Sequence, residues 1–415
     1  MNRKVSLGVA IAVIILAIAL TISATMTIAM RHFSSLVSDV GQRQAMYDYL
    51  DEIDTAARGQ YTIDEEVLRM ALAQGYLEGL NDPYAQYLSA AEYKQVQSEL
   101  AGNHTGFGIH LIVSDDNKLT VARVEENSPA ALSGIKAGNV VTKLDETAVT
   151  GASYAAVTGR LNTAEKLMLT VEQSGVESTM ELTANTYTNV SVEGRIVQEN
   201  VGYIRIRSFN SLTALQFKSL YNQLTQQGAL YFVFDLRNNE GGSLAAAQEI
   251  LGYLLPSGPY VNCTKKSGNE AFTASDPYEM TAASVTLING STAGEAELVA
   301  GVLQDMGKTR LVGTSTAGKA VVQEYFSLAS DKAAVKLTTG TLTRIQSGTG
   351  WQDTGLIPDQ TSDMAYNKLL RFELLTEAED DQLQAAVALV RSGLAATQQA
   401  AATTTAAATT TTTAG

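Results

Sequence analysis

Cysteine and histidine are scarce in this chain of 415 residues. Cys263 is the only cysteine, so no disulfide can form within the chain and thiolates cannot build a zinc site. The histidines are His32, His104 and His110, and their spacing does not give the i, i+4 pair of a helical metal site. We therefore predict no metal and no cofactor, and we interpret all three histidines as polar core or surface residues.

Basic residues are too few for a nucleic-acid-binding protein. The chain has 29 Lys and Arg against 43 Asp and Glu, which gives a formal net charge of -14 at pH 7. Phosphate backbones repel a surface of this sign, so we predict no nucleic-acid partner.

Long apolar runs are also absent, with one exception at the start of the chain. After Arg3 and Lys4, the stretch from Leu7 to Met30 carries no charge and consists largely of Ala, Ile, Leu, Val and Thr. A membrane span needs about 20 such residues and a signal-peptide core about 7–15, so the length predicts an uncleaved transmembrane signal anchor over residues 1–31. Because the basic residues before the run compete with Arg31, the flanking charges orient the span only weakly.

The rest of the chain divides by pattern into four parts. Residues 32–100 show helical periodicity with a break at Asn81-Asp82-Pro83, and residues 101–175 form a small module rich in strands. Residues 176–393 hold a larger core with a C-terminal helix. Residues 394–415 are nearly all Ala, Thr and Gln, so we predict a disordered tail.

Two of these parts have a clear order of elements. In the small module, strands are expected over residues 119–124, 140–144 and 166–172, and helices from Ser128 and over residues 154–161. In the core, strands are expected over residues 201–207, 230–235, 285–288 and 310–312, and helices over residues 212–226, 244–254 and 296–306. This alternation predicts an α/β fold with a mostly parallel sheet flanked by helices.

The small module opens on Gly106-Phe107-Gly108-Ile109. Two glycines around an apolar residue, followed by a strand, can present backbone N–H groups to a terminal carboxylate, and the strand can then pair with an extended peptide. Alone, this segment would be interpreted as an ordinary glycine turn. Together with residues 128–139, which include Gly134 and Gly138-Asn139, it resembles a PDZ domain of the bacterial protease type.

Further segments resemble the C-terminal processing (tail-specific) peptidase family, in the order and spacing of that family. They cover residues 75–88, 202–206, 235–242, 297–305, 318–323 and 355–359. The resemblance implies a crotonase-like serine protease core with an inserted PDZ domain that acts on protein or peptide C-termini outside the cytoplasm. It also implies that the bulk of the chain lies on the outer side of the cell membrane, and it leaves oligomerisation open.

The resemblance assigns catalytic roles to several positions. Members of the family use a serine nucleophile, a lysine general base and a glutamine that helps to hold the lysine. Lys319 and Gln323 fall on the base and glutamine positions, and such a lysine needs an apolar site that lowers its pKa. The backbone N–H groups of Gly241, Gly242 and Glu295 fall where the oxyanion would bind.

The nucleophile position does not carry a serine. The family places it in the turn that reads Thr292-Ala293-Gly294-Glu295-Ala296-Glu297 here, so the reactive position is Gly294. If the Glu295 carboxylate came near Lys319, it would hold the lysine charged and unfit as a base. Three explanations stay open: a pseudoprotease that binds tails, a displaced nucleophile at Ser291 or Thr292, or a serine replaced in this particular chain. The alternative interpretation of Ser291 and Thr292 is that they are turn residues and helix caps.

Three functions follow as hypotheses. The first is a membrane-anchored serine-type endopeptidase that docks C-termini through its PDZ domain. The second is a catalytically inactive scaffold or regulator of the same fold that captures tails without cutting them. The third, a structural scaffold of the cell wall or membrane, would use the Ala/Thr-rich tail but leaves Lys319 unexplained.

Overall fold

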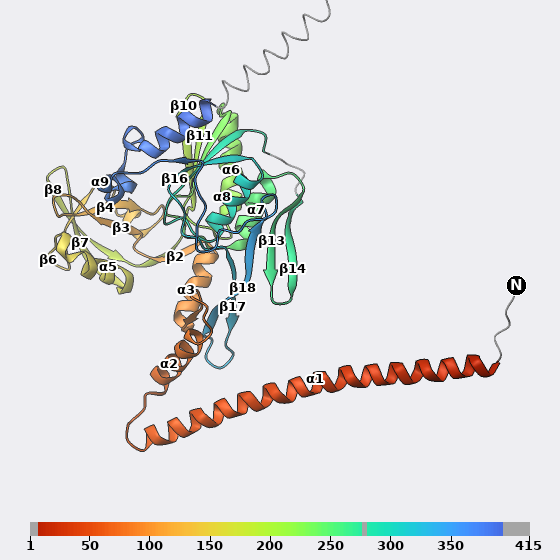
Figure 1. Ribbon diagram of the computed structural model, residues 1–415. Helices are drawn as coiled ribbons and strands as arrows, with labels where there is room; N and C mark the ends of the chain where they lie inside the picture. Colours follow the sequence, from red (N-terminus) through yellow and green to blue (C-terminus); the bar gives the residue numbers. More distant parts are fainter. Residues whose placement is uncertain (1–6, 276–279, 393–415) are drawn as a thin grey trace, which may run out of the picture. The chain divides into compact units, whose positions relative to one another are not determined.

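The computed structural model describes residues 7–275 and 280–392 (Figure 1). The chain separates into two compact units at Gly75, and each is described by itself. The predicted tail over residues 394–415 lies outside the described residues.

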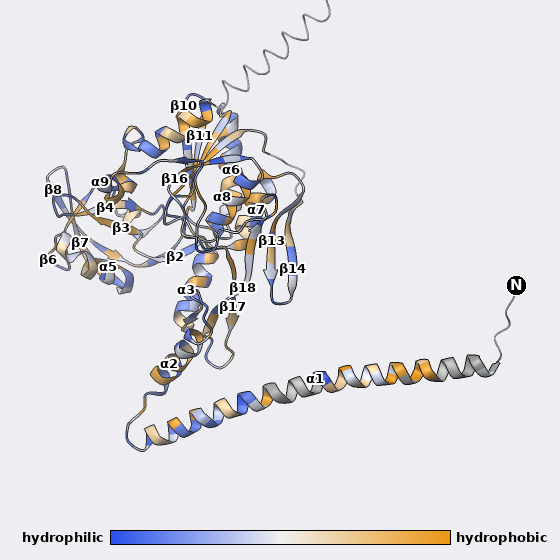
Figure 2. Cartoon of the chain, in the orientation of Figure 1, coloured by the Kyte–Doolittle hydropathy of each residue, from blue (hydrophilic) through white to orange (hydrophobic). Residues whose placement is uncertain are grey.

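The first unit consists of helix α1 (Leu7–Arg58) and most of α2 (Glu65–Glu78). Figure 2 shows that apolar residues concentrate in the N-terminal half of α1 and that polar residues follow. Within residues 7–275 and 280–392, no helix combines the length and the apolar character that a membrane crossing requires. The structure therefore does not support the predicted transmembrane anchor.

The second unit contains the predicted PDZ module, built on a sheet in the order β3-β4-β5-β7-β8. Its core is formed by apolar side chains such as Phe107, Leu119, Val157 and Leu169. The strands are β3 (Ile109–Val113), β4 (Leu119–Val124), β5 (Val140–Leu144), β7 (Lys166–Gln173) and β8 (Val176–Thr183), with short β6 (Thr147–Ala148) beside β5 and helices α4 (Pro129–Leu132) and α5 (Tyr154–Thr163). Strand β8 pairs with β7 along its whole length, so this sheet continues past residue 175, the predicted end of the module.

Two short strands connect the module to the rest of the unit. Strand β2 (Asn103–Gly106) enters the module and pairs with β9 (Asn185–Thr188), which leaves it. Helix α3 (Ala90–Leu100) precedes β2. Ser89 and Glu92 cap its N-terminus with a reciprocal capping box.

The core is a mostly parallel sheet, as predicted, in the order β10-β11-β12-β15-β16-β19. Side chains alternate between its two faces: Phe232 and Phe234 pack against helices on one face, and Val233 packs on the other against the helical residues 381–392. The strands are β10 (Val192–Gln198), β11 (Val201–Ile206), β12 (Tyr231–Asp235), β15 (Ala283–Ile288), β16 (Thr309–Gly313) and β19 (Gln360–Thr361), and the helices are α6 (Thr213–Gln226), α7 (Leu244–Leu254) and α8 (Glu295–Asp305). Only β10 runs antiparallel to its neighbour among these described strands.

A second, antiparallel sheet was not predicted from the sequence. Its central strand β18 (Ala334–Arg344) pairs with three others, and β14 extends it at one edge. The remaining strands are β1 (Gln86–Leu88), β13 (Gly258–Lys265), β14 (Gly268–Ala274) and β17 (Val321–Ser327).

A buried ion-pair network fixes the end of β12. The guanidinium of Arg237 donates to both Asp235 and Asp380, and Tyr203 donates its hydroxyl to Asp235 at 2.7 Å. Burial would raise the pKa of Asp235, but the charge and hydrogen bonds of Arg237 outweigh it and hold the pKa at about 2. Because the folded pKa is depressed, this stabilisation is present above the ordinary aspartate pKa and is lost as the pH falls toward 2. The network anchors the loop that continues from β12 to Gly241 and Gly242.

Candidate active site

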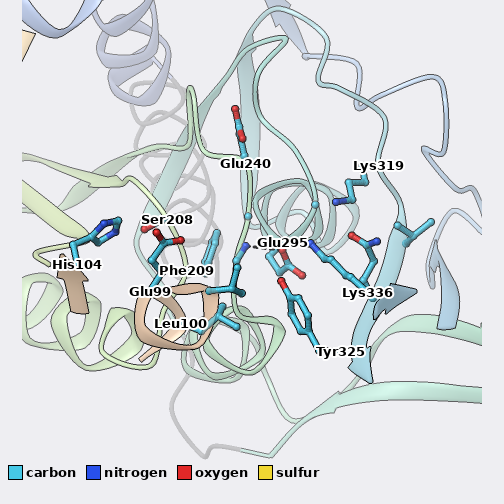
Figure 3. Close-up of a pocket in the computed structure, with 16 residues that line it drawn as sticks. Glu99, Leu100, His104, Ser208, Phe209, Glu240, Glu295, Lys319, Tyr325 and Lys336 are labelled. Atoms are coloured by element: carbon cyan, nitrogen blue, oxygen red, sulfur yellow. Dashed lines mark hydrogen bonds between the residues drawn. The ribbon is translucent and has the colours of Figure 1, made fainter. Parts of the chain in front are cut away.

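A cavity of about 420 Å³ lies among α3, the loop after β12, the start of α8 and strands β17 and β18 (Figure 3). It brings together predicted site residues from widely separated parts of the sequence: Gly241, Gly242, Gly294, Glu295, Lys319 and Gln323. Ser291 and Thr292 are not among the residues that line it.

The double-glycine turn forms one wall of the cavity. Both glycines have positive φ, +101° at Gly241 and +141° at Gly242, and a Cβ at Gly242 would lie 2.2 Å from the carbonyl oxygen of Phe209. The N–H of Gly241 donates to Asn239 Oδ1 at 2.8 Å. This N–H is thus bonded inside the turn, and its role as an oxyanion donor stays a prediction.

The N–H of Gly242 donates to the carboxylate of Glu295, with 2.8 Å between the nitrogen and Oε2. This side chain thus lies where the resemblance places the oxyanion. A Cβ on Gly241 would be 2.3 Å from the same oxygen, so only glycine allows this approach. The condition under which Glu295 would hold Lys319 charged is not met as an ion pair, since among the described residues no carboxylate oxygen lies within 4.0 Å of the Lys319 ammonium.

Gly294 caps the N-terminus of α8 with φ +58° and ψ -119°. This conformation is costly for residues with a side chain and marks a sharp, strained turn. A Cβ at this position would meet no atom closer than the carbonyl oxygen of Glu240 at 3.5 Å. The position therefore has room for a serine side chain, although it holds none.

Glu297 holds the two halves of the site together, a role that we did not predict. Its buried carboxylate accepts the N–H of Gly294 at 3.1 Å, the N–H of Gly318 at 2.8 Å and the N–H of Lys319 at 2.7 Å. It also accepts the hydroxyl of Thr316 at 2.5 Å. One carboxylate thus fixes the nucleophile turn and the lysine segment relative to each other.

Lys319 and a second lysine, Lys336, enter the cavity from neighbouring segments of chain. The ammonium of Lys319 lies 5.2 Å from the ring centroid of Tyr84, and that of Lys336 lies 5.4 Å from the ring centroid of Tyr325. Burial, and then the charge of Lys319, lower the pKa of Lys336. Lys336 is a site residue that sequence reasoning missed, because no motif marks it.

Gln323 supports the lysine segment indirectly. Its side-chain amide donates to the carbonyl oxygen of Tyr84 at 2.9 Å, and no hydrogen bond to Lys319 is formed among the described residues. The glutamine therefore fixes the tyrosine whose ring lies beneath the ammonium, rather than contacting the lysine itself.

Comparison with known proteins identifies the family. The sequence model of peptidase family S41 matches residues 200–362, and that of the PDZ domain matches residues 95–172. The carboxyl-terminal-processing protease of Picosynechococcus is 30% identical over 329 residues, which cover 77% of this chain and 78% of that protein. The chain belongs to the carboxyl-terminal-processing protease family. The protease of that name from Synechocystis is 29% identical over 348 residues, covering 81% of this chain and 78% of that protein.

The fold agrees with this family. The crystal structure of a putative S41 protease from Bacteroides fragilis superposes with a TM-score of 0.56 at 19% identity, covering 76% of this chain and 88% of that one. The predicted combination of a PDZ domain with an α/β protease core is thereby confirmed.

In this carboxyl-terminal-processing protease relative, the two proposed substitutes for the serine are poorly placed. Thr292 is fully buried, and its hydroxyl donates to the carbonyl oxygen of Leu236 at 2.9 Å. Ser291 is exposed, and its N–H donates to Asn289 Oδ1. Both hold the turn before α8. The serine that does line the cavity is Ser208, which lies near His104 and Glu99 on the side away from the lysines (Figure 3).

The predicted peptide-binding residues of the PDZ domain run from the end of β2, where Gly106 pairs with β9, to the start of β3 at an edge of the sheet. Among the described strands, β3 has β4 as its single partner, and α5 packs beside it. Gly108 has φ +75°, and a Cβ there would lie 2.2 Å from Ser128, so the loop requires glycine. Phe107 is buried in the module core, and Ile109 begins the edge strand. This arrangement can accept an extended peptide by strand addition.

Proposed function

We propose that this protein captures protein C-termini through its PDZ domain and holds them without cleaving them. The observation that carries the proposal is the hydrogen bond from the Gly242 N–H to the Glu295 carboxylate beside a nucleophile position that is glycine. A peptidase of this type needs a nucleophile and a free oxyanion donor, and here the first is missing and the second is occupied.

The PDZ domain supports the binding half of the proposal. An unpaired strand edge supplies main-chain hydrogen bonds, and the partly exposed apolar side chains of β3, such as Ile109 and Val113, favour an apolar last residue in the ligand. The glycine loop that precedes β3 would receive the terminal carboxylate.

Peptide-bond cleavage is the second candidate, because Lys319 and the Glu297 network that positions it are intact. In that case Ser208 is the first nucleophile to examine, since it lines the same cavity. A cleaving enzyme would also have to move the Glu295 carboxylate away from Gly242.

Binding is tested with one peptide in two forms. We expect the full chain to bind a peptide that ends in an apolar residue with a free carboxylate, and to bind the same peptide about 10-fold or more weakly when its C-terminus is amidated, because the amide loses a charge-assisted hydrogen bond. Fluorescence anisotropy measures both affinities, and mass spectrometry of the recovered peptide shows whether it is intact. Equal affinity for the two forms would contradict capture of C-termini.

The location of the protein also belongs to the proposal. We infer membrane attachment, with the bulk of the chain outside the cytoplasm, from the uncharged run between Leu7 and Met30 and from the exposed apolar side chains on α1, which include Leu20 and Ile28. In cells that express the full chain, we expect it in the membrane fraction and open to protease added from outside. Recovery in the soluble cytoplasmic fraction would overturn this inference.

A further inference from the structure

Two lysine ammoniums face the core cavity without a carboxylate partner. Among the described residues, neither Lys319 nor Lys336 has a carboxylate oxygen within 4.0 Å. Each ammonium lies over a tyrosine ring. Burial and then the charge of Lys319 lower the pKa of Lys336, and the more distant carboxylate of Glu295 acts against them. The positive potential of the pair favours an anion between them.

The opposite wall of the same cavity already holds a carboxylate. Glu295 Oε2 accepts the Gly242 N–H, and the missing side chain of Gly241 makes room for it. The N-terminus of α8, where Glu295 is the first residue, adds a favourable dipole. The turn at Gly241 and Gly242 therefore binds a carboxylate, and in this structure the carboxylate is that of Glu295 from the same chain.

Apolar side chains complete the cavity next to this charged part. Val96, Leu100 and Phe209 line it, and Figure 3 shows Glu295 lying between Leu100 and Phe209 on one side and the two lysines on the other. A ligand that fits both parts carries a carboxylate next to an apolar group, as the last residue of an apolar peptide does. Because residue 294 is glycine, the space that a side chain would occupy at this position is free for a ligand.

We propose that the core cavity is a second receptor for the free α-carboxylate of a peptide with an apolar last residue. The ligand carboxylate replaces that of Glu295 on the Gly242 N–H and lies close to Lys319 and Lys336. Glu295 is then an internal competitor that keeps the affinity low until a ligand arrives. This inference rests on the proposed function, because a cleaving site would not retain its ligand.

The test uses N-acetyl-leucine, which is too short to extend strand β3, and N-acetyl-leucinamide as its uncharged match. Titration calorimetry with the full chain is expected to show saturable binding of the acid and none of the amide at the same concentrations. Glu295→Gln is expected to tighten binding of the acid about 10-fold, and Lys336→Gln to weaken it about 10-fold, since each changes one charged contact. Glu240→Gln is the matched control: it removes a charge from an exposed residue of the same cavity and should change the affinity less than about twofold.

Several outcomes overturn the inference. The first is the absence of saturable binding, and the second is equal binding of the acid and the amide. The third is binding of the acid that neither Glu295→Gln nor Lys336→Gln alters, because this would assign the ligand to the PDZ loop. The failure of the proposed function is separate, because it would appear as cleavage of a long substrate, whereas N-acetyl-leucine reports only on binding.

Discussion

The double variant Gly294→Ser with Glu295→Ala is expected to cleave an unfolded protein that ends in an apolar sequence. The serine hydroxyl would lie at the position that has room for a side chain, on the same segment that Glu297 ties to Lys319. Removal of the Glu295 carboxylate would free the Gly242 N–H for the oxyanion. Mass spectrometry of the substrate over time measures the appearance of fragments.

The single variants separate the two defects. Gly294→Ser alone is expected to be at least about 100-fold slower than the double variant, because one oxyanion donor is worth about 10²- to 10³-fold in rate. Glu295→Ala alone should give no cleavage, since no nucleophile is added. Adding Lys319→Ala to the double variant should abolish the activity, and cleavage that survived this change would show that Lys319 is not the base.

Loss of the Glu297 carboxylate is expected to produce the second largest effect, on stability. In Glu297→Gln, one of the carboxylate oxygens becomes an NH₂ group that faces N–H and O–H donors such as those of Gly318 and Thr316. The buried donors would lose hydrogen bonds to a charged acceptor, and the loss of each such bond costs roughly 1.5–3 kcal/mol. We therefore expect the free energy of unfolding to fall by about 3 kcal/mol or more. Urea unfolding followed by circular dichroism measures the change.

Glu249→Gln provides the matched control, because Glu249 is exposed on α7. It should change the free energy of unfolding by less than about 0.5 kcal/mol. If Glu297→Gln were as mild as this control, the carboxylate would not hold the two segments together.

The sequence predicted the parallel sheet well because its signals are local. The apolar run that became β12 and the helix α7 that follows it were both expected within a residue or two. The antiparallel sheet was missed because strands such as β14 are largely exposed and have no continuous apolar run. Strand β8 was not predicted for the same reason, since it buries few residues.

Of the candidate site, only the residues that belong to sequence motifs could be predicted. Lys319, Gly242 and Gly294 were expected together, and they line one cavity. The bond between Glu295 and Gly242 joins residues 53 positions apart and depends on how two loops meet, which no local pattern encodes. Lys336 and Ser208 enter the cavity through tertiary packing as well, without a motif of their own.

The most direct test of the central claim uses the unmodified chain. The full chain and its Lys319→Ala variant are each incubated with an unfolded protein that ends in an apolar sequence, and the products are followed by mass spectrometry. We expect no fragments from either protein, because Gly294 supplies no nucleophile and Glu295 occupies the oxyanion donor. Fragments that form with the unmodified chain and vanish with Lys319→Ala would contradict capture without cleavage and identify a working peptidase.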